Sequence, residues 1–415
     1  MRVYQFRHAR TEDGGMKQLG REIATTIFTD SAPHHALGIG VLSHPCQQTF
    51  YFHHPLITVK KLHSVMPTSF SDIHGEIDGL NAHLFTLKSA NGLQAKVSEL
   101  GAHLTSVIWV DDDGNEQELT ISHDSFQGWK DNSACYLGAT CGRCANRIAH
   151  GEFNIGQSRY TLATNNAPAD IPCHLHGGPT GFHTRLWRGE LLEDGERHGV
   201  RLTLHSPDGD EGYPGNLNVA VTYWLNDNNE LSWHAEATTD QATLVNIVNH
   251  TYWNLSGELN APVTDHQIQI HADYFLPTNA GMIPTGEIRS VTDTPMDFTR
   301  PQLIGKNIQT DYEPLHLSGG YDHCMVLRDH HNQTIEPQTA AIVHHPGTGR
   351  SLEVLTNQPG IQFYTGNYLS DPFGHRSGLC LETQGFPDAP NHPNFPSVVL
   401  QPGETYQHDL IWKIS

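Results

Sequence analysis

The sequence predicts an all-β fold, a large antiparallel β-sandwich with few short helices. From about residue 80 onward, apolar and polar side chains alternate with a period of two, which is typical of strands buried on one face. No long helical stripe interrupts this alternation. Turn-forming pairs recur at short intervals, at Asp113-Gly114, Asp208-Gly209, Pro214-Gly215, Pro346-Gly347 and Pro402-Gly403. Many short strands joined by polar turns indicate a sandwich or barrel.

The clearest strand runs begin after residue 90. Residues 93–98 follow the hairpin signal Asn91-Gly92, and every second side chain from Leu93 to Val97 is apolar. The same alternation returns in three later runs, at residues 200–205, 217–225 and 231–237. We find neither an internal repeat nor a linker in this part of the chain. The sequence therefore predicts one domain over residues 76–415.

The first 75 residues differ from the rest of the chain. Apolar residues at intervals of three, four and four predict one face of a short helix, at Met16, Leu19, Ile23 and Ile27. No sustained period follows them. We predict that residues 1–75 are an N-terminal extension of unknown role, either dispensable or disordered. Because Met66 lies just before the strand pattern, we hypothesise that residues 1–65 are dispensable.

The composition excludes several classes of partner. The 415 residues include 45 acidic and 24 basic side chains, which gives a formal net charge of −21 with histidine neutral. Nucleic acids and anionic membranes are bound by basic surfaces, so we expect neither as a partner. No apolar run approaches the roughly 20 residues of a membrane-spanning helix. A neutral small molecule fits this composition best.

Cysteine usage and the N-terminus predict a cytoplasmic location. The seven cysteines are an odd number and lack the spacing of a disulfide framework. The first residues, Met1 to His8, turn polar before any apolar core of a secretory signal forms.

Glu382 is the first candidate for chemistry. It ends the apolar run Leu379-Cys380-Leu381 and precedes a polar loop that contains Pro387, Pro390, Pro393 and Pro396. Proline fixes φ, so this loop is held in place, and a carboxylate beside it suits a general base. The alternative is a strand-end glutamate with a purely structural role.

Three histidines stand out among the 30 in the chain. His250 lies in a predicted strand with amides and aromatic residues, and His176 is followed by two glycines that let backbone approach a ligand. His323 follows Asp322. Arg143 and Arg147 are four residues apart, so both could point into one cleft, although surface ion pairs are the commoner fate of arginine.

A zinc site has to be considered because Cys141 and Cys144 have ligand spacing and precede Cys173, His174 and His176. One CxxC pair is a weak signal and the second cluster has an unusual form, so we expect no metal. We find no phosphate-binding glycine loop and no Gly-x-Ser-x-Gly motif. The remaining candidates favour acid–base chemistry on a polyhydroxylated ligand, without a cofactor.

Over residues 80–415 the chain resembles the galactose mutarotase (aldose 1-epimerase) family. The resemblance lies in an ordered set of motifs: Gly142-Arg143-Cys144-Ala145-Asn146-Arg147-Ile148, Leu175-His176-Gly177-Gly178, Asp208 to Gly215, Asn249-His250-Thr251-Tyr252-Trp253, Ile283 to Gly286, Gly320 to His323, Gln358 to Asn367, and Leu381-Glu382-Thr383-Gln384. Each motif alone is weak, whereas the ordered set is specific. The resemblance implies a β-sandwich, in agreement with the period-two pattern.

The resemblance also implies roles for individual residues. Glu382 would take the proton of the anomeric hydroxyl, and His250 would protonate the ring oxygen. His176 would bind and polarise the sugar. The positions that match sugar-holding residues of the family are Asn146, Arg147, Tyr252, Asp322 and Gln362. Such chemistry predicts a bell-shaped pH dependence in which Glu382 is ionised while a nearby carboxylate keeps His250 protonated.

Several questions stay open at this point. The approach to Leu175 is longer than the family pattern, so either His174 or His176 could contact the sugar. Asp322 and Glu382 could be the paired carboxylates of a glycosidase. A hexose-6-phosphate 1-epimerase or a non-catalytic sugar-binding module could share the same fold. The preferred aldose is not set by the sequence, and we expect a monomer or a homodimer.

Overall fold

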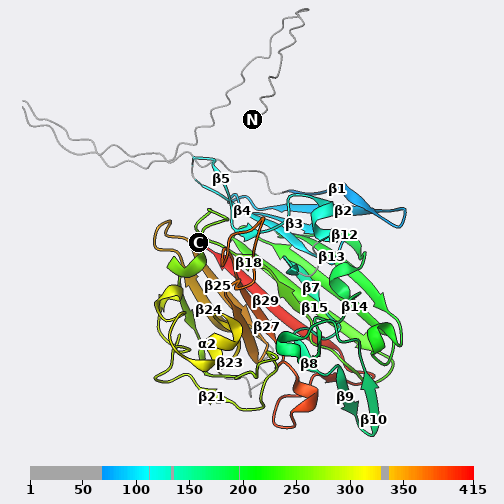
Figure 1. The fold of residues 1–415 in the computed structure, drawn as a ribbon. Coiled ribbons are helices and arrows are strands. Elements are labelled where there is room, and N and C mark those ends of the chain that lie inside the picture. Colours follow the sequence, from blue (N-terminus) through cyan, green and yellow to red (C-terminus); the bar gives the residue numbers. More distant parts are fainter. Residues whose placement is uncertain (1–67, 112, 132–134, 196, 329–335) are drawn as a thin grey trace, which may run out of the picture. The chain divides into compact units, whose positions relative to one another are not determined.

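The computed structural model describes residues 68–111, 113–131, 135–195, 197–328 and 336–415 (Figure 1). Strands dominate these residues, and the two α-helices among them are α1 (Phe126–Asp131) and α2 (Glu313–Ser318). Single 3-10 turns occur at η2 (Pro168–Asp170), η3 (Phe182–Thr184), η4 (Asp210–Gly212), η5 (Val263–Asp265), η6 (Ile304–Lys306) and η7 (Ala389–Asn391). None of the helices in the described ranges has the length and apolar character to cross a membrane. The predicted all-β fold is confirmed.

The largest sheet is antiparallel, with the spatial order β12-β13-β14-β15-β29-β25-β24-β19-β22. In that order its strands are β12 (Arg188–Asp194), β13 (Arg197–Ser206), β14 (Leu217–Leu225), β15 (Glu230–Thr239), β29 (Tyr406–Ile414), β25 (Ser351–Thr356), β24 (Gln338–His344), β19 (Gln267–Ile270) and β22 (Gln302–Leu303). The three later strand runs predicted from the sequence lie in β13, β14 and β15. In β15, buried side chains from Leu231 to Ala237 alternate with half-buried polar ones, as the period of two requires.

A second antiparallel sheet has the order β21-β20-β23-β26-β27-β18-β6. Its strands are β21 (Arg289–Ser290), β20 (Ala272–Phe275), β23 (Asp322–Leu327), β26 (Gly360–Tyr364), β27 (Leu379–Gln384), β18 (Tyr252–Trp253) and β6 (Thr120–Ile121). Four two-stranded pairs join β10 (Ser158–Thr161) to β9 (Glu152–Ile155), β11 (Cys173–Leu175) to β8 (Arg147–Ala149), β16 (Thr243–Leu244) to β28 (Val399–Leu400), and β17 (Val248–His250) to β7 (Ala139–Cys141).

A third sheet runs in sequence order through β1 (Thr68–Ile77), β2 (Leu80–Lys88), β3 (Gln94–Ser98), β4 (Leu104–Val110) and β5 (Glu116–Glu118). Strand β3 accounts for the run predicted at residues 93–98. The domain boundary predicted at residue 75 falls inside β1, which pairs with β2. The short helix predicted around residues 16–27 lies outside the described residues.

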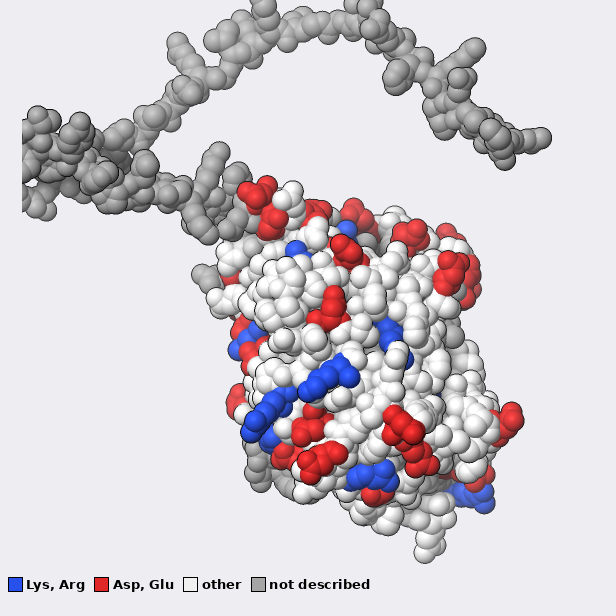
Figure 2. Space-filling view, turned by 60° about the vertical axis from the view of Figure 1, so that its left-hand side comes forward, with Lys and Arg blue, Asp and Glu red and all other residues white. Residues whose placement is uncertain are grey.

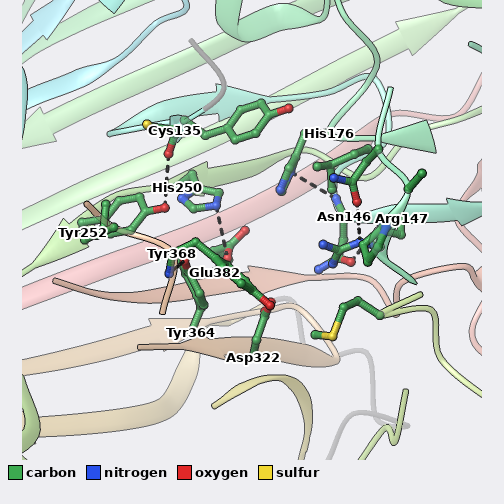
Figure 3. Close-up of a pocket in the computed structure, with 17 residues that line it drawn as sticks. Cys135, Asn146, Arg147, His176, His250, Tyr252, Asp322, Tyr364, Tyr368 and Glu382 are labelled. Carbon is green, nitrogen blue, oxygen red and sulfur yellow. Dashed lines mark hydrogen bonds and ion pairs between the residues drawn. The ribbon is translucent and has the colours of Figure 1, made fainter. Parts of the chain in front are cut away.

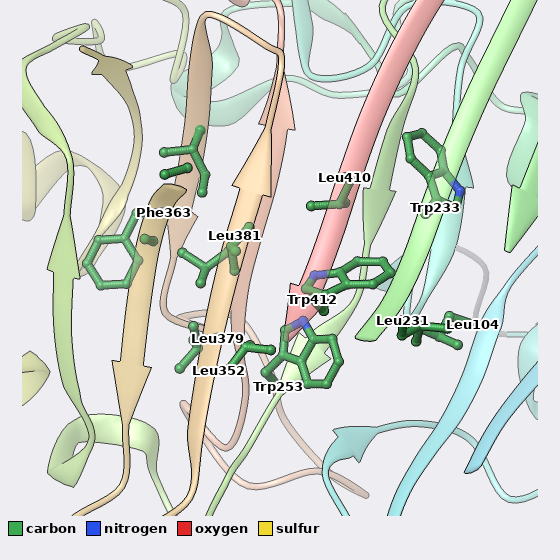
Figure 4. Close-up of a cluster of buried hydrophobic side chains, with 14 of the residues drawn as sticks. Leu104, Leu231, Trp233, Trp253, Leu352, Phe363, Leu379, Leu381, Leu410 and Trp412 are labelled. Atoms are coloured by element: carbon green, nitrogen blue, oxygen red, sulfur yellow. The ribbon is translucent and has the colours of Figure 1, made fainter. Parts of the chain in front are cut away.

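The core lies between the sheets, and its largest side chains are Trp233, Trp253 and Trp412 (Figure 4). Trp233 and Trp412 come from neighbouring strands of the nine-stranded sheet, while Trp253 belongs to the seven-stranded sheet. The rings of Trp253 and Trp412 lie 5.6 Å apart, so the two sheets meet directly through them. An aromatic pair of this kind contributes about 0.5 to 1.5 kcal/mol beyond the burial of its surface.

On the face of the seven-stranded sheet that is opposite to this core, a row of polar side chains projects from neighbouring strands. Along β27, Leu379 and Leu381 join the core cluster, and the side chain of Glu382 therefore points to the opposite face. Glu382 pairs in register with Gln362 of β26, and Asp322 of β23 lies on the same face. Three adjacent strands thus bring two carboxyl groups and an amide together.

The surface carries charges of both signs. On the face that Figure 2 displays, Lys and Arg side chains are interspersed with Asp and Glu rather than gathered in one patch. Acidic residues nevertheless outnumber basic ones across the chain, 45 to 24.

Candidate active site

A cavity of about 490 Å³ lies over the polar face of the seven-stranded sheet (Figure 3). It is lined by Cys135, Tyr136, Asn146, Arg147, Asn166, Ala167, Pro168, Leu175, His176, His250, Tyr252, Met282, Asp322, Tyr364, Tyr368, Leu369 and Glu382. Seven of the eight predicted site residues line this cavity, and Gln362 is the exception. Residues from distant parts of the sequence therefore meet in one cavity that is large enough for a monosaccharide.

Glu382 and His250 face each other across the floor of the cavity. His250 ends β17, Glu382 lies in β27, and Nε2 of His250 is 3.6 Å from Oε1 of Glu382. The two residues are only 5% and 2% exposed. Within the described part of the chain, Oε2 of Glu382 has no hydrogen-bond partner although it is buried. An unpaired buried carboxylate oxygen is costly, which points to a ligand hydroxyl as its partner.

The cavity favours the uncharged forms of both groups. Burial raises the pKa of Glu382 well above its ordinary value, and the negative charge of Asp322 adds to this effect while Arg147 opposes it. Burial lowers the pKa of His250 to about 4. The sequence predicted that a nearby carboxylate keeps His250 protonated, and in the sugar-free cavity the burial of the ring acts against this.

Asp322 is held from behind by Gln362. The amide nitrogen of Gln362 donates a 2.6 Å hydrogen bond to Oδ1 of Asp322, and Gln384 in turn donates to Oε1 of Gln362 at 3.1 Å. Gln362 is not among the residues that line the cavity, and its predicted contact with the sugar stays a prediction. Burial raises the pKa of Asp322, while Arg147 and Gln362 counteract this by favouring the carboxylate.

Asn146 and Arg147 enter the cavity from the start of β8. Asn146 has a positive φ of 56°, a conformation that asparagine tolerates better than most residues. Its Oδ1 accepts a hydrogen bond from the backbone N–H of Arg147 at 2.9 Å. The Nε–H of Arg147 donates to Oδ1 of Asn166 at 3.3 Å, which fixes the direction of the guanidinium.

His176 lies beside His250, and its ring packs 4.5 Å from the ring of Tyr136. Its Nδ1 accepts a hydrogen bond from the backbone N–H of Asn146 at 3.3 Å. In a neutral imidazole the other nitrogen then carries the proton, so Nε2 of His176 is a donor. Burial lowers the pKa of His176 well below its ordinary value, which keeps the ring neutral.

His174 does not reach the cavity. Its ring is fully buried, and its Nδ1 lies 2.7 Å from the carbonyl oxygen of Ala163. Of the two histidines left open by the sequence, His176 is the one that lines the cavity. Gly177 next to it has a φ of 84°, and a side chain there would collide with the carbonyl of Gly142. The glycine therefore permits close packing of two backbone segments.

Arg143 and His323 point elsewhere. The guanidinium of Arg143 is buried and donates to the carbonyl oxygens of Pro214 and Gly215, at 2.9 and 3.0 Å. The spacing of four had left open that Arg143 and Arg147 share one cleft, and the structure does not bear this out. Residues 142–146 form neither a helix nor a strand, so the spacing carries no directional meaning there. The ring of His323 packs edge-on against Phe275 in the core.

Two side-chain groups among the described residues have the donor atoms for a metal, and hydrogen bonding argues against both. The first group is His176, His250 and Glu382. In His176, however, Nδ1 already accepts a hydrogen bond from the backbone of Asn146, and Nε2 carries the proton. In the second group, Nδ1 of His266 contacts Asp265 and Nε2 accepts from the backbone of Leu255, so no lone pair is left. Neither group includes Cys141 or Cys144.

The aromatic lining was missed from the sequence. Tyr136, Tyr364 and Tyr368 contribute ring surface, and the rings of Tyr364 and Tyr368 lie 6.3 Å apart and nearly parallel. Tyr368 is 62% exposed, which places it at the rim. Sugars present C–H faces that pack on aromatic rings, and the close spacing of Tyr364, which ends β26, and Tyr368 in the loop after it was the available signal.

Comparisons with known proteins agree on one family. The model of the family described as aldose 1-epimerase matches residues 83–413. Galactose mutarotase of Bos taurus is 41% identical over 339 residues, which cover 80% of this chain and 93% of the bovine protein. Aldose 1-epimerase of Escherichia coli K12 is 36% identical over 338 residues, with coverages of 79% and 94%. The crystal structure of galactose 1-epimerase from Lactobacillus acidophilus superposes with a TM-score of 0.74 at 29% identity, covering 84% of this chain and 99% of that one.

Proposed function

The chain belongs to the aldose 1-epimerase family, and on this premise we propose that Glu382 and His250 are the base and the acid with which it interconverts sugar anomers. The activity of an aldose 1-epimerase makes the chain an isomerase. The observation that carries the residue assignment is the 3.6 Å approach of the two side chains at the floor of a cavity of sugar size.

Ring opening needs two proton transfers. The Glu382 carboxylate takes the proton of the anomeric hydroxyl, and the His250 imidazolium gives a proton to the ring oxygen as the C1–O5 bond breaks. The electron pair of the O1–H bond becomes the carbonyl of the open-chain aldehyde. Rotation about C1–C2 presents its other face, and ring closure returns both protons. Each positioned acid or base contributes about 100- to 10,000-fold.

The two transfers leave the number of protons on the pair unchanged. Before opening, Glu382 is ionised and His250 is charged; after opening, both are neutral. The neutral combination is the one that burial favours in the free cavity. The pair therefore titrates as one unit, and the active form carries a single proton shared between two sites.

The remaining lining residues bind the sugar hydroxyls in this proposal. The Asp322 carboxylate accepts a hydrogen bond from one sugar hydroxyl, and Asn146 and Arg147 hold neighbouring hydroxyls. The Nε2–H of His176 donates a hydrogen bond to a sugar oxygen. Arg147 is the single Lys or Arg among the residues that line the cavity in the described ranges, which favours an uncharged aldose over a sugar phosphate. Galactose and glucose are the proposed substrates, with a role in hexose metabolism. The cytoplasmic location and a monomeric or homodimeric state remain predictions.

Polarimetry tests the proposal. Freshly dissolved α-galactose and α-glucose should approach anomeric equilibrium faster with the wild-type protein, and Glu382→Gln should lower the rate by at least about 100-fold. The same assay with α-glucose 6-phosphate tests for a hexose-phosphate epimerase, and release of nitrophenol from an aryl glycoside tests for a glycosidase. A Glu382→Gln variant with wild-type activity would contradict the assignment.

A further inference from the structure

The side of the His250 ring that faces away from Glu382 contacts a thiol. Nδ1 of His250 lies 3.5 Å from Sγ of Cys380, which is fully buried. Cys380 lies in β27 two residues before Glu382, so both ring nitrogens of His250 face the same strand. The proton transfers described above use Nε2 alone and assign no role to this contact.

Cys380 has a second neighbour across the sheet. Tyr252 of β18 is its partner in the antiparallel register, and the Tyr252 hydroxyl is within hydrogen-bonding reach of the thiol. The Tyr252 O–H also lies 3.2 Å from the backbone carbonyl oxygen of Cys135. These contacts form a series that leads from the imidazole of His250 to the thiol, the phenol and the carbonyl. All of the residues in this series are buried or half-buried.

The carbonyl of Cys135, at the end of this series of hydrogen bonds, sets the direction in which each group donates. A carbonyl oxygen can only accept, so the Tyr252 hydroxyl donates to Cys135. Burial raises the pKa of the Cys380 thiol well above its ordinary value, so this group keeps its proton. Because the hydrogen of the Tyr252 hydroxyl is directed at the carbonyl oxygen of Cys135, the Tyr252 oxygen presents a lone pair that can accept the S–H of Cys380. The sulfur of Cys380 is then left as an acceptor for an N–H of His250. In the opposite direction, the Tyr252 oxygen would turn a lone pair toward the carbonyl, which is repulsive.

We propose that Cys380 is a positioning residue that accepts a hydrogen bond from the Nδ1–H of His250, so that only Nε2 exchanges a proton during the reaction. This rests on the proposed function, in which Nε2 of His250 gives and retakes the proton of the ring oxygen. A neutral imidazole has one N–H, and an Nε2 that must accept a proton on ring closure requires the proton to be on Nδ1. The Cys380 sulfur selects that tautomer.

A thiol suits this position better than a carboxylate would. A carboxylate at Nδ1 stabilises the imidazolium, whereas sulfur is a weak hydrogen-bond acceptor. His250 therefore gains its orientation and tautomer from Cys380 without being fixed in the charged form. The imidazolium remains a strong acid, as protonation of a weakly basic ring oxygen requires.

NMR of the sugar-free protein labelled with ¹⁵N-histidine tests the tautomer without turnover. The His250 signals are identified by their absence from the spectrum of His250→Asn. We expect Nδ1 of His250 to have the chemical shift of a protonated nitrogen at pH 7 to 8. A shift of unprotonated Nδ1 in the wild-type protein overturns the proposal.

Substitutions of Cys380 supply the second test. In Cys380→Ala, Nδ1 loses its acceptor, so its signal should move toward the unprotonated position and kcat should fall about 10- to 100-fold. Cys380→Ser should restore the Nδ1 signal and kcat in large part, because a hydroxyl can also accept one hydrogen bond and donate another. Cys144→Ser is the matched control, since this buried thiol packs in a cluster with Ile148, Phe153 and Tyr213 and is not among the residues that line the cavity. In this variant the Nδ1 signal of His250 and kcat should match the wild type.

The outcomes separate the two proposals. A folded Cys380→Ala with the wild-type Nδ1 signal and rate overturns the role of Cys380. If Cys380→Ala does not fold, the wild-type spectrum and Cys380→Ser decide the matter. Full activity of Glu382→Gln overturns the proposed function instead, and the Nδ1 signal of His250 still reports whether Cys380 selects the tautomer.

Discussion

The amide of Gln362 holds the carboxylate of Asp322 at 2.6 Å from the neighbouring strand, outside the cavity that Asp322 lines. Gln384 fixes the orientation of the Gln362 amide by donating to its oxygen. In the proposed function, Asp322 is thus directed at the sugar by two buried glutamines that are hydrogen-bonded in series. The proposed pair of Glu382 and His250 can only act on a sugar that is held by such pre-oriented groups.

Replacement of Gln362 by methionine should weaken sugar binding more than it slows the chemistry. A hydrogen bond to a charged group contributes about 1.5 to 3 kcal/mol, so we expect KM to rise about 10-fold while kcat changes less than about 3-fold. Initial rates from polarimetry over a range of galactose concentrations measure both. Gln358→Met is the control, because Gln358 is half-buried and bonds to Asn357 and Gln407 away from the cavity. A Gln362→Met variant with unchanged KM contradicts this role of the glutamines.

The alkaline limb of the pH–rate profile should belong to Glu382. The active form carries one proton on the pair, and loss of this proton from the neutral combination ionises Glu382, whose pKa burial raises well above its ordinary value. Ionisation of a carboxyl creates charge, whereas ionisation of an imidazolium does not, so an organic cosolvent raises only the first pKa. We expect the alkaline limb of kcat/KM to move to higher pH in about 20% ethanol. If the alkaline limb stays at the same pH in ethanol, it reports the ionisation of His250 instead of Glu382.

Asp322→Asn should move the same limb to lower pH. The negative charge of Asp322 helps to raise the pKa of Glu382, and its removal makes the carboxylate of Glu382 easier to form. The measurement is kcat/KM against pH, which reports the free protein even if KM rises. Asp265→Asn is the control, since this carboxylate contacts His266 and lies outside the cavity. A shift to higher pH in Asp322→Asn contradicts the electrostatic account.

Truncation tests the domain organisation predicted from the sequence. A chain that begins at Met66 keeps all of β1, and we expect its Tm within about 2 °C and its kcat/KM within about twofold of the full chain. A chain that begins at Glu76 loses most of β1, including His74, whose ring packs against Trp129 at 5.4 Å. We expect this second truncation to lower Tm by at least about 5 °C. Failure of the Met66 chain to fold contradicts the hypothesis for residues 1–65.

The strands and the main site residues could be predicted because they follow local rules. Alternation in β15 is a property of neighbouring residues, and it survives because one face is buried. Glu382 was found because an acidic residue ends an apolar run before a proline-rich loop. These signals depend on the backbone pattern alone.

The remaining features depend on tertiary packing. Arg143 turned away from the cavity because its segment is irregular, which no spacing rule describes. Gln362 lies behind Asp322, and only the register of β23 and β26 shows this. The low pKa of His250 follows from its burial, a quantity that the sequence does not contain. Motifs therefore located the site, and packing determined the orientation of each side chain.

Buried histidines should make the protein sensitive to acid. In the described part of the chain, burial is the first cause of a lowered pKa at eight buried histidines: His103, His174, His176, His183, His250, His266, His323 and His408. Unfolding exposes these rings, which then bind protons near pH 6.5. In the folded state, several of the rings stay neutral down to about pH 4. The free energy of unfolding therefore falls as pH drops through 6.5, by up to about 1.4 kcal/mol per pH unit for each ring.

The buried carboxyl groups with a raised pKa act in the opposite direction, and among the described residues they are fewer than these histidines. Burial raises the pKa of Glu382, Asp322 and Asp388, so their contribution to stability is lost as pH rises. With eight rings against three carboxyls, we expect Tm to fall steeply below pH 6.5 and the protein to unfold between about pH 4.5 and 6. Calorimetry and circular dichroism from pH 8 to 4 measure this. His323→Leu removes one buried ring outside the cavity and should lower the number of protons taken up on unfolding by about one. A Tm that stays constant from pH 8 to 5 would show that the rings are protonated in the folded state.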